Sequence, residues 1–269
     1  MLRSMYSGVS GMKGFQTKLD VIGNNIANVN TTGFKSSRVM FKDILSQTSS
    51  GASAPDGADR AGLNAKQVGL GVSVSSIDTL HLPGSAMTTN NPTDLRINGD
   101  GFFLVKMTPD QEPAYLTRAG DFHIDANRNM VTSDGFLVVD AGGTPITLAD
   151  NVTSFSISQD GTIVQQLEDG ETDTGTQIGM ARVTNPEGLE KIGGSLYRTT
   201  VNSNIDAIEP GVANADGLGA IISGQLEMSN VDLTGEFTEM IVAQRGFQAN
   251  SRIITTSDEV LQEVVNLKR

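Results

Sequence analysis

The sequence has no cysteine and no tryptophan, and aromatic residues make up only 5% of its 269 positions. Without cysteine the chain can form neither a disulfide nor a thiolate metal site. The opening stretch MLRSMYSGVSGMKGF contains no apolar run long enough for a signal peptide, and no other stretch approaches the length of a membrane span. Sec-type secretion and membrane insertion are therefore not expected.

Positive charge is also scarce, because 19 Lys and Arg stand against 31 Asp and Glu and give a formal net charge of −12. A surface that binds nucleic acid needs a basic face, and no local basic cluster is evident in the sequence. Nucleic acid is therefore not an expected partner. Gly, Asn, Thr and Ser are plentiful, which is more typical of a β-rich structural protein than of an enzyme with a deep pocket.

Catalytic and metal-binding motifs are missing as well. Residues 125–136 begin like a calcium loop, but Met130 stands where that loop needs Gly and Phe136 stands where it needs Glu. The two histidines, His81 and His123, have no HExxH context, and the sequence contains no GxGxxG, P-loop or GxSxG motif. We therefore expect no catalytic residues, no metal site and no cofactor.

The residues that are present predict a long helix at each end of the chain. In residues 2–29, large apolar side chains recur every seven positions in two rows. The first row is Met5, Met12, Leu19 and Ile26, and the second is Phe15, Ile22 and Val29, with Gly8 in its first place. Two such rows are typical of a coiled-coil-like seam. The helix would extend roughly 42 Å at 1.5 Å per residue, which is long for a helix on a small globular core.

The C-terminal segment carries a matching pattern. Its seven-residue row consists of Leu233, Met240, Phe247, Ile254 and Leu261. The segment opens with SNVD, in which Ser229 and Asp232 have the spacing of a capping box. Neither terminal helix would be apolar on all sides, so each needs a partner, and the most economical partner is the other terminal helix.

Between the helices the pattern changes to that of β hairpins. Asp-Gly pairs occur at Asp100-Gly101, Asp134-Gly135, Asp160-Gly161 and Asp169-Gly170. Apolar or alternating runs flank the first three, and Asp-Gly between such runs is a strong local signal for a hairpin turn. The stretches 46–65 and 209–219 are rich in Gly, Ser and Ala and are predicted to be exposed loops or linkers.

The predicted fold class is therefore α+β, with three regions. Residues 1–34 and 229–269 are expected to pair as a coiled-coil-like inner domain of long helices. Residues 35–75 and 213–228 are expected to form a linker region. Residues 76–212 are expected to form a central antiparallel β-rich body.

Several stretches resemble the flagellar basal-body rod and hook protein family. The N-terminal stretch MLRSMYSGVSGMKGFQTKLDVIGNNIANVNTTGFK and the C-terminal stretch SGQLEMSNVDLTGEFTEMIVAQRGFQANSRIITTSDEVLQ are similar to its two terminal signatures. INGDGFF and YLTRAGDFHIDANRNMVTSDGFLVV resemble the body of the same proteins. The resemblance spans nearly the whole chain. Within the family it favours a short hook subunit of the Gram-positive type, with the distal rod subunit as the alternative.

The resemblance implies a structural subunit of the bacterial flagellum, not an enzyme. Such a subunit would assemble with copies of itself into an open helical tube outside the cell, in the hook or basal body. It would be exported through the flagellar type III apparatus without a cleaved signal peptide. As a hook subunit it would form a flexible tube that transmits motor torque to the filament. Its further partners would then be the distal rod and hook–filament junction proteins and the hook cap.

The polar residues of the terminal helices raise a question about this assembly. Asn24 and Asn25 interrupt an otherwise apolar helical pattern, and Gln244 offers a matching amide in the C-terminal segment. A polar residue in a coiled coil gives up stability to fix register, so these amides are candidates for the helix-pairing and polymer interface together with the apolar rows. The alternative is that the asparagines simply accompany a helix end. A second class of function also stays open, a soluble β protein that dimerises through its terminal helices.

Overall fold

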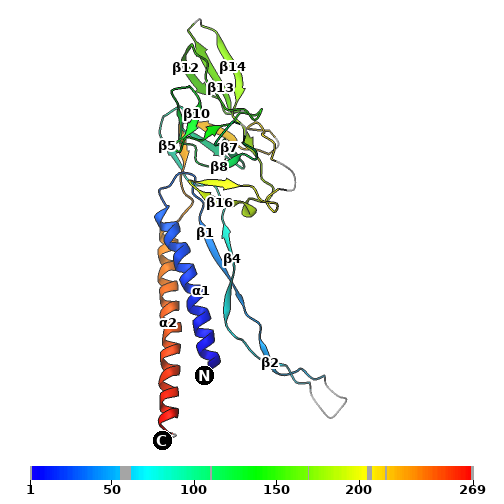
Figure 1. The fold of residues 1–269 in the computed structure, drawn as a ribbon, viewed down its shortest axis with the longest axis vertical. Helices are drawn as coiled ribbons and strands as arrows, with labels where there is room; N and C mark the ends of the chain where they lie inside the picture. The colour runs from blue at the N-terminus through cyan, green and yellow to red at the C-terminus, as the bar shows by residue number, and fades with distance from the viewer. Residues whose placement is uncertain are drawn as a thin grey trace. The chain divides into compact units, whose positions relative to one another are not determined.

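The computed structural model describes residues 2–54, 62–109, 111–168, 170–204, 208–215 and 217–267 (Figure 1). Helix α1 spans Leu2–Ala27 and helix α2 spans Leu233–Asn266, and the named strands between them all pair in antiparallel fashion. The predicted α+β class, with terminal helices and a central antiparallel β-rich region, is confirmed at this level. Neither helix, over its described residues, has the length and apolar character needed to cross a bilayer.

The chain forms two compact units. Unit 1 consists of Met1–Ile26, Ser37–Thr79 and Asp232–Arg269, and unit 2 consists of Ala27–Ser36 and Leu80–Val231. Unit 1 therefore contains both terminal helices together with an early β segment. Unit 2 contains the remaining strands and the short stretch that follows α1.

Helix α2 begins differently from the capping-box expectation. Asp232 itself is the N-cap residue, and its Oδ1 accepts a hydrogen bond from the Thr234 backbone N–H at 3.0 Å. Ser229 lies three residues before the cap and is buried in unit 2. A side-chain oxygen at the N-cap satisfies one of the free N–H groups of the first turn, so Asp232 fixes the helix start without Ser229.

Unit 1 also contains a long β ribbon. Strand β1 (Ser37–Asp43) pairs with β4 (Val72–Thr79), and β2 (Gln47–Ser50) pairs with β3 (Lys66–Val68). An isolated bridge joins Ser53 to Leu63. The expectation of a loop over 46–65 is therefore wrong for Gln47–Ser50 and for the bridge between Ser53 and Leu63, while 55–61 lies outside the described residues. The stretch has the Ser- and Gly-rich composition of a loop. Strands pair through backbone N–H and C=O groups, however, and this pairing does not require apolar side chains.

The main sheet of unit 2 has the strand order β16-β17-β8-β7-β11-β10-β9, and β15 also pairs with β7. Its strands are β7 (Phe102–Lys106), β8 (Tyr115–Thr117), β9 (Phe122–Ile124), β10 (Met130–Thr132), β11 (Leu137–Val138), β15 (Met180–Ala181), β16 (Glu190–Gly193) and β17 (Leu196–Arg198). All five residues of β7 are buried, so this strand lies at the centre of the body. A single 3-10 turn, η1 (Pro186–Gly188), precedes β16.

Smaller sheets complete unit 2. One has three strands, β12 (Val152–Ile157), β13 (Thr162–Leu167) and β14 (Thr172–Gln177). Two further pairs join β6 (Leu95–Asn98) to β18 (Ala220–Ser223) and β5 (Ala86–Thr88) to β19 (Gln225–Glu227). Within 213–228, the expected return linker, the structure thus places Ala220–Ser223 and Gln225–Glu227 in strands of the body. These strands pair with residues far away in sequence, which no local pattern reveals.

The Asp-Gly predictions have a mixed outcome. Strands β10 and β11 pair across Asp134-Gly135, and β12 and β13 pair across Asp160-Gly161, as predicted. Strands β13 and β14 also pair around the fourth site, although Asp169 itself lies outside the described residues. The prediction at Asp100-Gly101 is wrong, because β6 pairs with β18 and β7 pairs with other strands. Strand β6 thus pairs with β18, which is distant in the sequence, and not with the next strand, β7.

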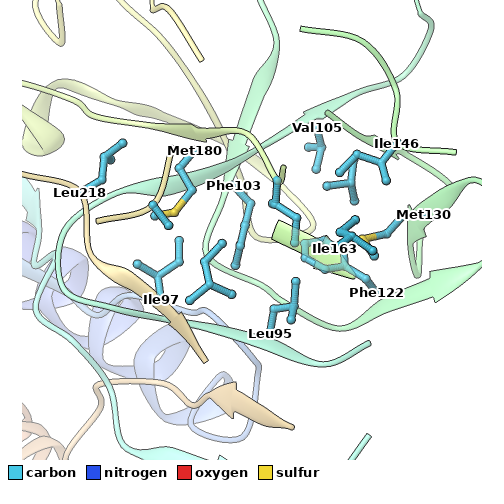
Figure 2. Packing of buried hydrophobic residues seen from close by; sticks show 14 of the residues in the cluster. Leu95, Ile97, Phe103, Val105, Phe122, Met130, Ile146, Ile163, Met180 and Leu218 are labelled. Atoms are coloured by element: carbon cyan, nitrogen blue, oxygen red, sulfur yellow. The ribbon is translucent and has the colours of Figure 1, made fainter. Parts of the chain in front are cut away.

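The core of unit 2 is apolar and draws on several sheets (Figure 2). Phe103 and Phe122 are both fully buried, and their rings meet edge to face with centroids 5.2 Å apart. Leu95 and Ile97 of β6, Met130 of β10 and Ile163 of β13 belong to the same cluster. Burying this many large side chains is the main source of stability for a body of this size.

Gly33 illustrates how tightly the stretch after α1 is packed in unit 2. Its φ is +67°, and a Cβ there would lie 2.4 Å from the Ala119 backbone nitrogen. We expect Gly33→Ala to lower the free energy of unfolding of unit 2 by at least about 2 kcal/mol, because it adds a backbone clash to the positive φ. Denaturant unfolding followed by tyrosine fluorescence measures this.

Gly135→Ala is the matched control for this substitution. Gly135 also has a positive φ, at +83°, but no atom lies within 4 Å of a Cβ there. Its cost should stay near about 1 kcal/mol, the strain of the backbone conformation alone. Equal losses in the two variants would mean that the Ala119 contact has no effect.

Candidate assembly interface

Helices α1 and α2 lie side by side in antiparallel directions within unit 1 (Figure 1). A Cβ placed on Gly8 would lie 3.4 Å from Ile254 Cγ1, and one on Gly246 would lie 2.6 Å from Phe15 Cζ. Further along, Lys18 forms an ion pair with Glu239. Residues closer to the C-terminus of α1 therefore contact residues closer to the N-terminus of α2, as expected for antiparallel helices.

The contacts between the helices involve small, polar and large apolar residues. On α1 they involve Gly8, Gly11, Phe15, Lys18 and Asn25, and on α2 they involve Glu236, Glu239, Gly246, Asn250 and Ile254. The sequence predicted a pairing role for Phe15, Asn25 and Ile254 but not for Gly11, Lys18, Glu239 and Gly246. Small residues permit the close backbone approach, because a side chain at Gly11 would press against Asn250, 2.9 Å away.

The other predicted seam residues are placed as follows. Met5, Met12, Leu19, Ile26 and Val29 are each only partly buried, whereas Ile22 is buried, at 4% exposure. On α2, Leu233 and Phe247 are exposed, while Met240, Ile254 and Leu261 are partly buried. Asn24 and Gln244 are exposed on their helices. The row that begins at Met5 is therefore only partly buried in the subunit, and its pairing role stays a prediction.

Asn25 has a role inside the subunit that its sequence context did not reveal. Its Oδ1 accepts a hydrogen bond from the Ser37 backbone N–H at 3.0 Å, and its Nδ2 donates to the Ser37 carbonyl at 2.8 Å. The same Nδ2 donates to Glu236 Oε1 at 2.9 Å. One buried amide thus ties α1 to β1 and to α2. Because an amide can satisfy donors and acceptors together, Asn fits this position better than an apolar residue.

The β ribbon packs against α1 on another face. The Phe41 ring lies 6.0 Å from the Phe15 ring, centroid to centroid, and would contact a Cβ at Gly14. The Val72 backbone N–H donates to Ser10 Oγ at 3.3 Å. Unit 1 is therefore held by a glycine-containing helix that contacts α2 on one side and the ribbon on another.

A large apolar surface is left open on α2. Ten large apolar side chains of this helix and its C-cap are 37–85% exposed among the described residues: Leu233, Phe237, Ile241, Val242, Phe247, Ile253, Val260, Val264, Val265 and Leu267. Single exposed apolar residues are ordinary, whereas ten of them along one helix are typical of a helix that contacts another chain. This surface on α2 is the best candidate for contact with another chain.

A second polar centre lies in unit 2. The buried carboxylate of Glu227 accepts hydrogen bonds from Lys35 Nζ at 2.5 Å and from Arg118 Nη1 at 3.2 Å. Burial by itself would raise the pKa of Glu227, but the charges of Arg118 and Lys35 outweigh it and hold the pKa below its usual value. Sequence reasoning missed this cluster because Arg118 and Lys35 lie 109 and 192 positions from Glu227 along the chain.

His81 lies beside this cluster, between aromatic rings. Its ring centroid is 5.6 Å from that of Phe102 and 5.4 Å from that of Tyr197. Burial, and then the positive charges of Lys35, Lys191 and Arg118, lower the pKa of His81 from 6.5 to about 4. The Pro186 carbonyl opposes this only weakly, and both buried ring nitrogens lack a hydrogen bond of ordinary geometry. The histidine is therefore a neutral structural residue at neutral pH.

Nothing among the described residues favours catalysis. No group of three or more His, Asp or Glu side chains is placed to hold a metal ion within the described ranges. A cavity of about 510 Å³ borders His81, Phe102 and Arg118, but Arg118 is already engaged by Glu227 and the Gly99 carbonyl. The described geometry offers an assembly surface and a buried ionic cluster.

Comparison with known proteins gives three family matches along the chain. The model described as "Flagella basal body rod protein" matches residues 5–35. "Flagellar hook protein FlgE/F/G D1 domain" matches residues 96–165, and "Flagellar basal body rod FlgEFG protein C-terminal" matches residues 222–267. The first and last matches cover α1 and α2, and the middle one covers the central strands of the body.

Curated relatives match over their full lengths. The flagellar basal-body rod protein FlgG of Bacillus subtilis is 55% identical over 271 residues, covering 100% of both chains. FlgG of Borreliella burgdorferi is 38% identical over 270 residues, again covering 100% of both. The flagellar hook protein FlgE of the same organism is 30% identical, but that alignment runs over 447 positions.

The seam predicts different outcomes for two isoleucines of α2. Ile254→Asp should lower the free energy of unfolding of the helix pair by about 2–4 kcal/mol, because it places a carboxylate against Gly8 in a partly apolar contact. Ile241→Asp should leave the subunit nearly unchanged, because Ile241 is 59% exposed. Far-ultraviolet circular dichroism melting of both variants tests the assignment. Equal melting curves would show that Ile254 makes no contribution to the seam.

His81 predicts a loss of stability in mild acid. A base whose pKa is lowered on folding is more easily kept neutral in the folded state than in the unfolded state. Its contribution to the free energy of unfolding is therefore complete above the pKa of the unfolded state and decreases as the pH falls toward the pKa of the folded state. Between about pH 7 and about pH 5 the free energy of unfolding should fall by about 2 kcal/mol from this group. His81→Phe should flatten that dependence in denaturant titrations. The exposed His123 is the control, and a flattened profile in His123→Phe would contradict the assignment.

Proposed function

The chain belongs to the flagellar basal-body rod and hook protein family, and from this premise we propose that it is a distal rod subunit. In that role it is a structural protein that assembles with copies of itself into a straight tube. The observation that carries the proposal is the 55% identity to a rod protein over 100% of both chains.

The rod replaces the hook subunit that the sequence resemblance had favoured. Rod relatives align over 270 and 271 positions, whereas the hook relative requires 447. The chain therefore aligns with the rod relatives with few gaps, whereas many positions of the alignment with that hook protein have no counterpart in it. The alternative reading of the sequence, the distal rod, is the better supported of the two.

The β ribbon supports the same choice. A hook bends as it rotates and needs loosely packed contacts that rearrange, whereas a straight shaft favours ordered contacts. Within the stretch 46–65, which was expected to be a loop, Gln47–Ser50 form a strand that pairs with Lys66–Val68, and Ser53 forms a bridge with Leu63. Their exposed side chains on both faces fit a ribbon that lies against a neighbouring subunit.

The open apolar surface of α2 is the proposed polymer contact, with a second copy of this chain as its occupant. The ten exposed side chains lie on one helix that α1 covers only along its seam. Copies of the chain that repeat by one helical operation would bury this surface without closing into a ring. Met5, Met12, Leu19, Asn24 and Gln244 remain proposed members of the same interface.

Location and further partners follow from the proposed role. A rod subunit would be exported through the flagellar type III apparatus and would meet other rod proteins on one side and the hook on the other. The predicted division into an inner helical domain, a linker region and a β body also belongs to this proposal, as a description of the assembled subunit.

A deletion strain separates rod from hook. Cells without the protein should be non-motile, and electron microscopy of their basal bodies should show assembly ending before the distal rod. Assemblies of the purified protein should be straight. Basal bodies with a finished rod and no hook, or uniformly curved assemblies, would instead support the hook.

Ile241→Asp tests the proposed contact in the same strain. Because the substitution should leave the fold intact, it should block motility and assembly through the lost apolar contact alone. Thr255→Asp places the same charge at an exposed polar position of α2 and should leave motility within about twofold of the wild type. Normal assembly of the Ile241 variant would exclude this part of the surface.

A further inference from the structure

The chain passes between the two units four times, at Ile26–Ala27, Ser36–Ser37, Thr79–Leu80 and Val231–Asp232. On the unit 2 side of the last three passages lie three short segments, 31–36, 80–84 and 227–230, which we call the exit segments. Their mutual placement decides where the chain enters and leaves the body. None of the three segments belongs to a helix or to the main sheet. Glu227, at the end of β19, is their one residue in a strand.

Glu227 contacts the other two exit segments and the body at once. Its Oε1 accepts hydrogen bonds from Lys35 Nζ at 2.5 Å and from the Gly84 backbone N–H at 3.0 Å. Its Oε2 accepts from Arg118 Nη1 at 3.2 Å, and Arg118 also donates to the Gly99 carbonyl. The Glu227 backbone carbonyl accepts from the Gly33 N–H at 2.8 Å.

Lys35 and Asn230 complete the connections. Lys35 Nζ donates to the Leu82 carbonyl at 2.7 Å and to Glu227, so this ammonium connects its own exit segment to the other two. Asn230 Oδ1 accepts from the Ser36 N–H, and its Nδ2 donates to the Leu80 carbonyl, each at 2.8 Å. Every exit segment is thus tied to both of the others by side-chain hydrogen bonds.

The cluster is buried and borders an apolar cluster of the body. Lys35 and Glu227 have side chains only 1% exposed, and that of Arg118 is 5% exposed. The Arg118 guanidinium lies over the ring of Phe102, 5.2 Å from its centroid. Replacing a buried ionic triad by apolar residues is often neutral or even stabilising, so stability alone gives no reason for charges here. Directional bonds, in contrast, fix positions that apolar packing leaves free to shift.

We propose that Glu227, Lys35 and Arg118 form an ionic joint that holds the three exit segments at fixed positions relative to one another. The joint is a property of the folded chain and does not depend on the rod assignment. If the chain is a rod subunit, the joint stiffens the points through which load passes between its parts, and this second step rests on the proposed function.

Hydrogen exchange of the full chain tests the joint with Glu227→Gln. The neutral amide leaves two buried cations without their anion, so the exit segments should open locally more often. We expect the amides of 33–36 and 80–84 to exchange at least about tenfold faster, while those of β7 stay within about threefold of the wild type. Unchanged protection of the exit segments would overturn the proposal.

Glu190→Gln is the matched control. It removes the carboxylate of the Arg198–Glu190 ion pair in the same unit, but both side chains are 54% exposed, so exchange in the exit segments should not change. Faster exchange of these segments in the control would mean that any lost charge loosens them, which would also overturn the proposal.

A second variant separates the joint from general stability if Glu227→Gln unfolds the whole body. The combination Lys35→Met, Arg118→Met and Glu227→Met removes every charge of the triad and leaves none unpaired. We expect β7 to regain wild-type protection while the exit segments continue to exchange rapidly. If the combination restores both, or protects neither, the charges do not act as a joint and the proposal fails.

Discussion

The close approach of α1 and α2 is the constraint on which unit 1 depends. Glycines at positions 8, 11 and 246 let the two backbones come near enough for Phe15 and Ile254 to fill the space between them. Because the two helices come from opposite ends of the chain, their pairing requires the intervening residues to leave this unit and return. The seam therefore requires the chain to cross between the units, and it does so four times.

The seam is also incomplete as a hydrophobic core. Its contacts include the polar residues Lys18, Asn25, Glu236 and Asn250, and a single α2 residue, Ala243, is buried among those described. Apolar side chains that would have deepened the seam point elsewhere and stay exposed on α2. Apolar surface that is buried inside the subunit cannot contact a neighbouring copy. The thin apolar packing of the seam and the exposed apolar side chains of α2 therefore go together.

Polar side chains take over where apolar packing is thin. Asn25 joins α1, β1 and α2 in unit 1, and Glu227 and Asn230 join the exit segments in unit 2. Each of these residues uses several donors or acceptors at once, which a single apolar contact cannot imitate. For a structural subunit this gives defined positions at places where large cores are absent.

The sequence by itself determined the two terminal helices, the antiparallel β character of the middle and the family. Heptad rows and Asp-Gly turns are local signals, so Phe15, Ile22, Ile254 and the turn at Asp134-Gly135 could be read directly. Tertiary structure alone decided that Asn25 bonds to Ser37, that β18 pairs with β6, and that Lys35, Arg118 and Glu227 meet. These contacts join residues that are distant along the chain or hidden by polar composition, and only the folded backbone brings their donors and acceptors within bonding distance.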